Sequence, residues 1–112
     1  MEAKGTINTE LDSMAIILHA GNAKSSAFEA MRAVKEGASE LFDEKYEEAT
    51  LEIKLAHKAH AELLRKLSAA DLMNDVDLLL VHAEGHLSST EIAIHLIKDL
   101  GDLYKWKESF NG

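Results

Sequence analysis

Two histidines four residues apart are the main candidates for chemistry in this chain of 112 residues. His82 and His86 project from the same side of any helix that contains them, because residues four apart are neighbours on a helix surface. That side is otherwise mostly apolar, and Ser88, Ser89 and Thr90 follow directly. A single histidine on such a face is more often a core residue with hydrogen-bonded nitrogens. Two of them followed by three hydroxyls indicate a functional site.

Several kinds of chemistry use a histidine pair. Histidines at i and i+4 can bind zinc or copper, but the same chain offers no evident third ligand. A zinc-protease helix needs a glutamate directly after the first histidine, whereas Glu84 comes one position later, about 100° further around the helix. A serine hydrolase needs a nucleophile elbow, which is absent. The remaining chemistry is a neutral imidazole that accepts a phosphoryl group, with His86 and hydroxyls such as Ser89 available to the phosphoryl oxygens.

A stripe of mostly small residues predicts a first helix over about residues 9–36. Thr9 is the expected N-cap, and Gly37 is the expected C′ residue. Gly21 lies inside this helix and costs about 1 kcal/mol relative to alanine, so we expect a close contact there. The stripe repeats at alternating steps of 4 and 3 and consists of Ile16, Ala20, Ala23, Ala27, Ala30 and Val34.

Two further helices, expected at about residues 40–68 and 75–107, carry the alternating spacing of a coiled coil. Asn74 is the expected cap of the last one. The seam of the second helix contains Tyr46, Ala49, Ile53, Ala56, His60, Leu63 and Leu67. The seam of the third contains Leu79, His82, His86, Ser89, Ala93, Leu96, Leu100 and Leu103, and beside it lies a second stripe of Leu80, Leu87, Ile94, Ile97 and Tyr104.

These patterns predict an all-α fold with one domain over residues 1–112. Three long antiparallel helices would form an up-down-up bundle. Helices of this length make a thin bundle, and the third helix is apolar on two adjacent faces, which is more than a lone three-helix unit needs. We therefore expect self-association, in which other copies of the chain complete the bundle by coiled-coil packing.

Composition excludes several classes of protein. Twenty acidic and twelve basic residues give a formal charge of −8, which opposes binding to nucleic acid. No apolar run approaches the length of a membrane span, and the N-terminus carries no signal pattern. Cysteine is absent, so disulfides and thiolate metal sites are excluded. We expect a cytoplasmic protein that does not insert into a membrane.

Four segments resemble the lactose/cellobiose-type IIA proteins of the bacterial sugar phosphotransferase system. Residues 79–87, Leu-Leu-Val-His-Ala-Glu-Gly-His-Leu, resemble that family's Leu-Leu-Val-His-Ala-Gln-Asp-His-Leu-Met. Residues 20–25 resemble its Ala-Gly-Asp-Ala-Arg-Ser, and residues 56–60 resemble its Ala-His-Lys-x-Gln. Residues 102–105 resemble its final Glu-Leu-Tyr-Lys. The resemblance covers residues 14–106, in the same order and on the same expected helices.

The resemblance implies a homotrimer of three-helix subunits that serves as a phosphotransferase component working through a phosphohistidine. His82 would accept the phosphoryl group from phospho-HPr and pass it to a cysteine of the IIB component during disaccharide uptake. We expect His86 to support this transfer, and Glu84 and Ser89 to form the phosphoryl environment. No cofactor is expected.

The chain departs from the family at three positions near the histidines. Glu84 replaces a glutamine, Gly85 an aspartate and Ser88 a methionine. The family's aspartate faces the trimer axis and contributes to a metal site, so with Gly85 we expect no metal. Glu84 adds a negative charge that opposes transfer unless it points away. Two alternatives remain: a helical-bundle scaffold or regulatory paralogue that has lost phosphotransfer, and a helical metal-binding protein that uses His82 and His86.

Overall fold

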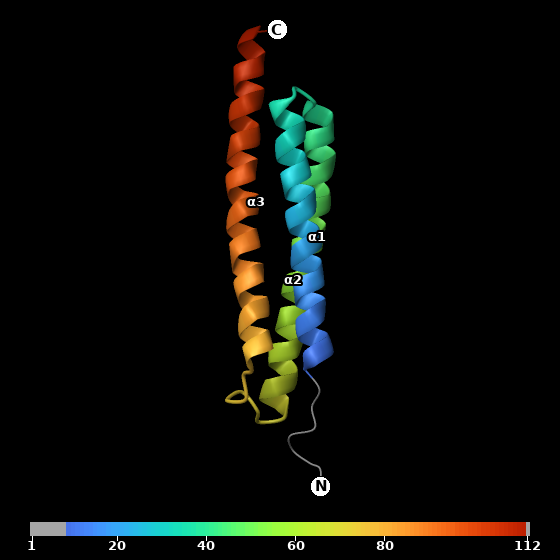
Figure 1. Cartoon of the computed structure of the whole chain (residues 1–112), viewed down its shortest axis with the longest axis vertical. Coiled ribbons are helices and arrows are strands. Elements are labelled where there is room, and N and C mark those ends of the chain that lie inside the picture. The colour runs from blue at the N-terminus through green and yellow to red at the C-terminus, as the bar shows by residue number, and fades with distance from the viewer. Residues whose placement is uncertain (1–8, 112) are drawn as a thin grey trace.

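The computed structural model describes residues 9–111, which form three long helices (Figure 1). α1 spans Glu10–Lys35, α2 spans Ser39–Ala69 and α3 spans Leu78–Asn111. The chain runs up, down and up again and makes a rod of 69 × 19 × 17 Å (Figure 1). The predicted all-α fold of three long helices is confirmed. Among the described helices, none contains a stretch both long and apolar enough to cross a membrane.

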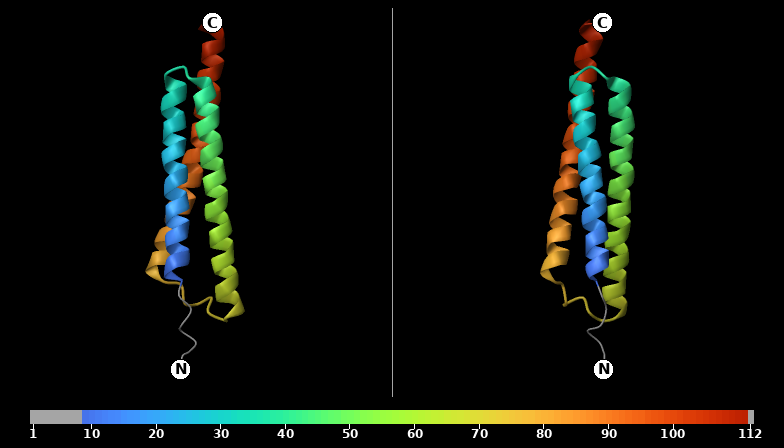
Figure 2. Two further views of the ribbon diagram at one scale, coloured as in Figure 1. Left: turned by 90° about the vertical axis from the view of Figure 1, so that its right-hand side faces the viewer. Right: turned by 45° about the vertical axis from the view of Figure 1, so that its right-hand side comes forward.

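The small-residue stripe of α1 lies at the centre of the bundle. All six of its members, from Ile16 to Val34, are buried. Alanine side chains leave room for neighbouring helices to come close, and Figure 2 shows α1 beside both α2 and α3. Gly21, in contrast, is exposed, and a Cβ added there would meet no atom within 4 Å. The close contact expected at Gly21 is therefore not made within the chain.

Both helix connections begin with a residue in the left-handed conformation. Gly37 has φ +84° and donates its N–H to the Val34 carbonyl, as a C′ residue does. Asp71 takes the same place after α2, with φ +59°. Because aspartate adopts this conformation much less readily than glycine, the sequence analysis did not identify Asp71 as a helix end.

The start of α3 differs from the expected one. The helix begins at Leu78 instead of near Asp75, and Asn74 does not cap it. Asp77 does, because its Oδ1 accepts the N–H of Leu80 at 2.8 Å. Thr9 occupies the N-cap position of α1 as predicted, but its hydroxyl lies 3.4 Å from Asp77 Oδ2 instead of capping its own helix. The capping segment expected before Thr9 lies outside the described residues.

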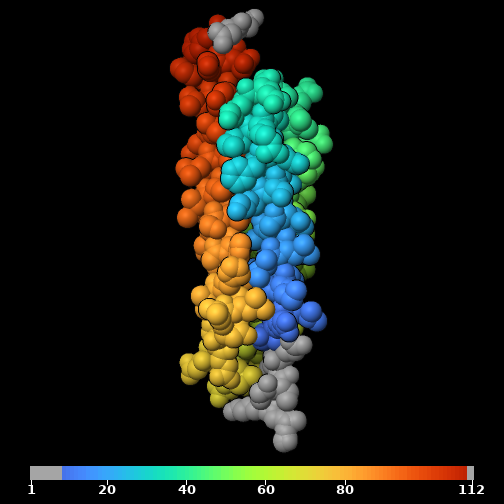
Figure 3. Space-filling view, viewed as in Figure 1, coloured from blue at the N-terminus to red at the C-terminus, as the bar shows by residue number. Residues whose placement is uncertain are grey.

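α3 buries the stripe that does not carry the histidine pair. The face turned into the bundle consists of Leu80, Ala83, Leu87, Thr90, Ile94, Ile97 and Gly101. The His82 stripe faces outward, where Leu96 is 64% exposed and Leu103 is 55% exposed. Figure 3 shows α3 forming one side of the rod, with no other helix over its outer side in this view. A single chain therefore leaves one apolar stripe of α3 without a partner among the described residues.

Phe42 fixes the approach of α2 to the C-terminal half of α3. Its ring is only 2% exposed and packs directly against the backbone of Gly101. Lys105 Nζ lies over the same ring, 5.0 Å from its centroid. A Cβ on residue 101 would overlap three atoms of the ring. Glycine is needed here for space and not for an unusual backbone angle.

Replacing Gly101 with alanine should lower the stability of the protein, although alanine is the better helix former by about 1 kcal/mol. The added methyl group has to displace the buried ring, and overpacking of this kind costs about 1–3 kcal/mol. Urea unfolding measures the effect. Adding Phe42→Leu to the Gly101→Ala variant should restore part of the loss. A Gly101→Ala protein as stable as the original would contradict the packing of Phe42 on this glycine.

A hydrogen-bonded carboxylate between α1 and α2 makes stability depend on pH. Glu52 Oε1 lies 2.8 Å from Nδ1 of His19 and accepts a bond from the amide of Asn22 at 3.2 Å. The bond with His19, and secondarily that with Asn22, holds the pKa of the Glu52 carboxyl below its ordinary value, although partial burial opposes this shift. The folded state thus binds fewer protons at this carboxyl than the unfolded state.

Glu52→Gln should therefore destabilise the protein at neutral pH by up to about 1 kcal/mol, the upper range for such partly exposed pairs. The stabilising contribution of Glu52 is fully present above the ordinary pKa of glutamate. It disappears as the pH falls through the lowered pKa of the folded state. Denaturant curves of both proteins across this range test the prediction. A difference in stability that grows in acid would contradict it.

Candidate functional site

His82 and His86 lie side by side on the outward face of α3, in its first turns. Their Nε2 atoms are 3.1 Å apart, and the two rings meet edge to face with centroids 4.5 Å apart. Because a hydrogen bond needs one donor, one Nε2 carries a proton and the other offers its lone pair. His82 is exposed and His86 is half-buried. The structure thus brings the two predicted histidines together at the surface.

A shallow depression of about 350 Å³ surrounds the pair and is lined by Val81, His82, Gly85, His86 and Ser89. Ser89 lies within it, and its hydroxyl donates to the carbonyl of His86 at 3.3 Å. Gly85 contributes no side chain, and a Cβ there would meet no atom within 4 Å. The site is open to solvent and does not enclose a small molecule. Such a surface suits exchange of a group with another protein.

Glu84 lies apart from this depression. Its Oε2 is 2.8 Å from Nε2 of His60, so the carboxylate sits between α3 and α2. The position follows from the helix, because residue 84 is about 200° around α3 from His82. Both members of the Glu84–His60 pair replace a glutamine of the family segments quoted above. Two positions at which the chain differs from the resembling segments are therefore in contact with each other.

A second histidine–glutamate pair also joins α2 to α3. His57 Nε2 lies 3.1 Å from Glu91 Oε2. The partners of His57 and His60 could not be predicted from the sequence, since the contacts join helices far apart in sequence and depend on the relative register of these helices. Among residues 9–111, no group of three or more histidine, aspartate or glutamate side chains is arranged to hold a metal ion.

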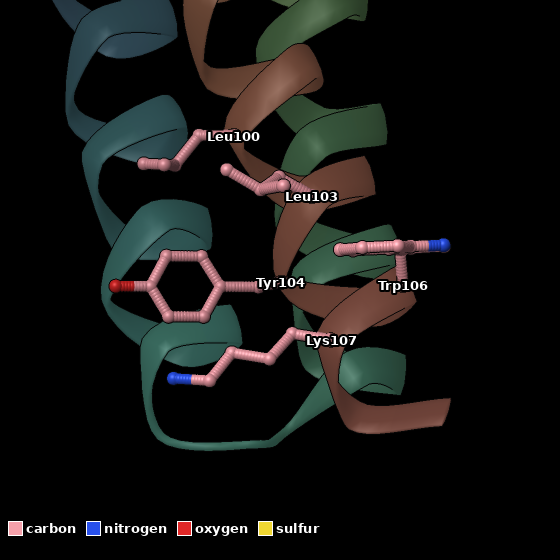
Figure 4. A pocket seen from close by; sticks show the side chains of 5 residues that line it. All are labelled: Leu100, Leu103, Tyr104, Trp106 and Lys107. Atoms are coloured by element: carbon pink, nitrogen blue, oxygen red, sulfur yellow. The ribbon is translucent and has the colours of Figure 1, made fainter. Parts of the chain in front are cut away.

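A second hollow lies near the C-terminal end of α3 and has a different character. It measures about 330 Å³ and is lined by Leu100, Leu103, Tyr104, Trp106 and Lys107 (Figure 4). The Tyr104 hydroxyl and Lys107 amine point to one side of α3, and Trp106 points to the other (Figure 4). Residue 100 is about 21 Å along the helix from residue 86. The hollow is mostly apolar and too distant to act on the histidine pair.

Comparison with known proteins places the histidine pair inside a matched family region. The family model described as the lactose/cellobiose-specific IIA subunit of the PTS system matches residues 12–105. The oligo-beta-mannoside-specific EIIA component of Bacillus subtilis (strain 168) is 37% identical over 101 residues, which are 90% of this chain and 91% of the relative. No solved structure gives a significant match.

Two other relatives have different printed specificities. The lichenan-specific phosphotransferase enzyme IIA component of the same organism is 34% identical over 80% of this chain and 81% of its own length. The N,N'-diacetylchitobiose-specific EIIA component of Escherichia coli (strain K12) is 28% identical over 82% of this chain and 78% of its own length. The names of these three relatives, which are of similar length, thus state three different sugar specificities.

Proposed function

The chain belongs to the lactose/cellobiose-specific IIA family of the sugar phosphotransferase system, and we propose that it carries phosphoryl groups on His82. The donor is phospho-HPr, and the acceptor is a cysteine of the IIB component that serves uptake of a β-linked disaccharide or oligosaccharide. The observation that supports this most strongly is the exposed, mutually bonded histidine pair on α3. The protein acts in the cytoplasm as a single domain, without a cofactor.

The proposed reaction consists of two in-line phosphoryl transfers. The first goes from the donor to a nitrogen of His82, and the second goes from His82 to the sulfur of the IIB cysteine. The lone pair of the neutral His82 ring attacks phosphorus while the bond to the donor breaks, and the phosphoryl group keeps its three terminal oxygens. The thiolate of the IIB cysteine later attacks the same phosphorus, and the P–N bond to His82 breaks. The first step needs no proton to leave the attacking nitrogen.

His86 supports this transfer through its own N–H. In the free protein its Nε2 is 3.1 Å from Nε2 of His82. When the phosphoryl group arrives, the His86 N–H can turn from the His82 ring to a phosphoryl oxygen. A hydrogen bond to this negatively charged oxygen stabilises the transition state. Ser89 adds a hydroxyl in the same depression. Glu84 does not oppose the transfer, because its carboxylate is bonded to His60 on the α2 side.

We also propose that the working form is a homotrimer joined through the outward face of α3. The stripe that carries His82 and His86 continues through Ala93, Leu96, Leu100 and Leu103 at coiled-coil spacing. Exposure of Leu96 and Leu103 in a single chain supports this assembly. Contiguous apolar surface of this kind marks an interaction site.

Restoring the family's carboxylate by Gly85→Asp should make the stability of the trimer depend on magnesium. The side chain fits, since a Cβ at this position meets no atom of the chain. Three aspartates facing one axis repel each other, which raises their pKa values in the folded state. That state then binds more protons than the unfolded one, so the metal-free variant gains stability as the pH falls.

Thermal unfolding of the Gly85→Asp protein, with magnesium and with chelator, provides the measurement. Magnesium should raise its Tm because a divalent cation offsets the repulsion. The original protein serves as control, and its Tm should not respond to chelator. A variant that ignores both magnesium and pH would show that residue 85 does not face other copies of itself.

A reconstituted relay tests the proposed function as a whole. Phosphoenolpyruvate, enzyme I, HPr and the IIB component are combined with and without this chain, and the mass of IIB is measured. We expect IIB to gain one phosphoryl group only when the chain is present. A scaffold that has lost phosphotransfer would leave IIB unmodified, and that result would refute the proposal.

A further inference from the structure

The nitrogen atoms of the histidine pair are spaced like two ligands of one metal ion. Zinc binds imidazole nitrogen at about 2.0–2.1 Å, so two such ligands lie about 2.9 Å apart at a right angle and about 3.4 Å apart at the tetrahedral angle. The Nε2 atoms of His82 and His86 are 3.1 Å apart. One Nε2 carries a proton in the free pair, so that ring has to take the tautomer protonated at Nδ1 and both rings have to rotate slightly before the two lone pairs meet on one ion.

No other pair of histidines in residues 9–111 presents this arrangement. His19, His57 and His60 each direct a ring nitrogen at a glutamate, at 2.8, 3.1 and 2.8 Å respectively. At His82 and His86 the rings face each other instead of a carboxylate. The depression around them is open, and no side chain at Gly85 obstructs it. In the single chain, an ion from solution can reach both nitrogens directly.

The arrangement favours an exchangeable ion over a resident one. Zinc sites that stabilise a fold have four protein ligands, whereas only two imidazoles meet here, and no third histidine or carboxylate joins them among the described residues. Water molecules would complete the coordination. Such a site differs in its ligand chemistry from the axial metal site that the family resemblance implies, which depends on an aspartate at the position of Gly85.

We propose that His82 and His86 together bind one divalent transition ion of the zinc, nickel or copper class, and that the bound ion prevents His82 from accepting a phosphoryl group. Imidazole suits these ions, while magnesium prefers oxygen ligands and keeps its waters. The nitrogen lone pair that coordinates the ion is no longer available to attack phosphorus. This second part rests on the proposed function, and the first part does not.

Calorimetric titration of the full chain, free of any affinity tag, tests the site itself. Zinc chloride and nickel chloride are the probes. We expect one ion per chain, with affinity at least tenfold weaker in both His82→Ala and His86→Ala. His57→Ala is the matched control and should bind like the original. Absence of binding in the original chain would refute the proposed site. Unchanged affinity in His82→Ala or in His86→Ala would refute it as well.

Phosphorylation of the zinc-loaded chain tests the block. Purified phospho-HPr, freed of enzyme I, is added to the chain with zinc, with magnesium or with neither, and the rate of mass gain is followed. Zinc should slow the gain at least tenfold, magnesium should not, and His86→Ala should have lost most of its sensitivity to zinc. Zinc binding without slower transfer would refute the block. A metal-free chain that takes no phosphoryl group would refute the proposed function and leave the calorimetric result standing.

Discussion

Replacing His82 with alanine should reduce phosphoryl acceptance from one group per chain to none. His82 is the exposed member of the bonded pair, and removing the nucleophile removes the bond that holds the phosphoryl group. The fold of the single chain should be unaffected, because the side chain lies outside its core. His95→Ala, an exposed histidine on the same helix, is the matched control and should retain full acceptance. Intact-mass measurement after incubation with phospho-HPr distinguishes these variants.

His86→Ala should behave differently from His82→Ala. The acceptor remains, but the ring that lies 3.1 Å from it, the proposed donor to the phosphoryl oxygens, is lost. Losing one donor to developing charge slows transfer on the order of 10²-fold, while the final extent stays at one group per chain. A folded His86→Ala protein without any acceptance, together with an active His82→Ala protein, would mean that the roles of the two residues are reversed.

The second large effect is expected from Leu96→Glu, which should dissociate the proposed trimer or unfold the protein. Leu96 is 64% exposed in the single chain and lies on the same stripe of α3 as His86, nearer the C-terminus. Burying one leucine contributes about 1.5–3 kcal/mol, and a trimer loses this contribution three times. The glutamates would also be desolvated near one another, which adds to the cost.

Light scattering at micromolar concentration measures this effect. The original chain should show three times the mass of one chain, and Leu96→Glu should show the mass of one. Lys98→Glu is the control, because residue 98 lies about 200° around α3 from Leu96 and is bonded to Asp102. It should leave the trimer intact. A monomeric original chain would refute the proposed assembly.

The parts of the fold predicted from the sequence are those that depend on spacing within one helix. The alternating stripe of α1, from Ile16 to Val34, is buried throughout. In α2 the predicted seam is also mostly buried, including Ala49, Ile53 and Leu63. Spacing was sufficient here because each helix has one dominant apolar stripe, and its burial drives packing.

α3 shows where spacing alone fails. Two adjacent stripes have equally regular periods, so the pattern cannot say which one faces α1 and α2. The structure shows that the Leu80 stripe does, which leaves the histidine pair outside. The sequence pattern likewise gave Asn74 as the cap where the structure has Asp77, because both residue types are good caps. The choice between them depends on the path of the loop after Asp71.

Contacts between helices could not be predicted because they depend on helix register. The ring of Phe42 against Gly101 and the carboxylate of Glu84 on His60 each join residues far apart in sequence. In the candidate site, the i,i+4 spacing was enough to bring His82 to His86. It gave no indication of where Glu84 would find its partner.

The most direct test of phosphoryl carriage is the intact mass of the full chain after exposure to phosphoenolpyruvate, enzyme I and HPr. We expect a gain of one phosphoryl group per chain that is lost on acid treatment, as a phosphohistidine is, and that fragmentation assigns to His82. An unchanged mass, an acid-stable phosphoester, or a phosphoryl group that remains in His82→Ala would contradict this expectation.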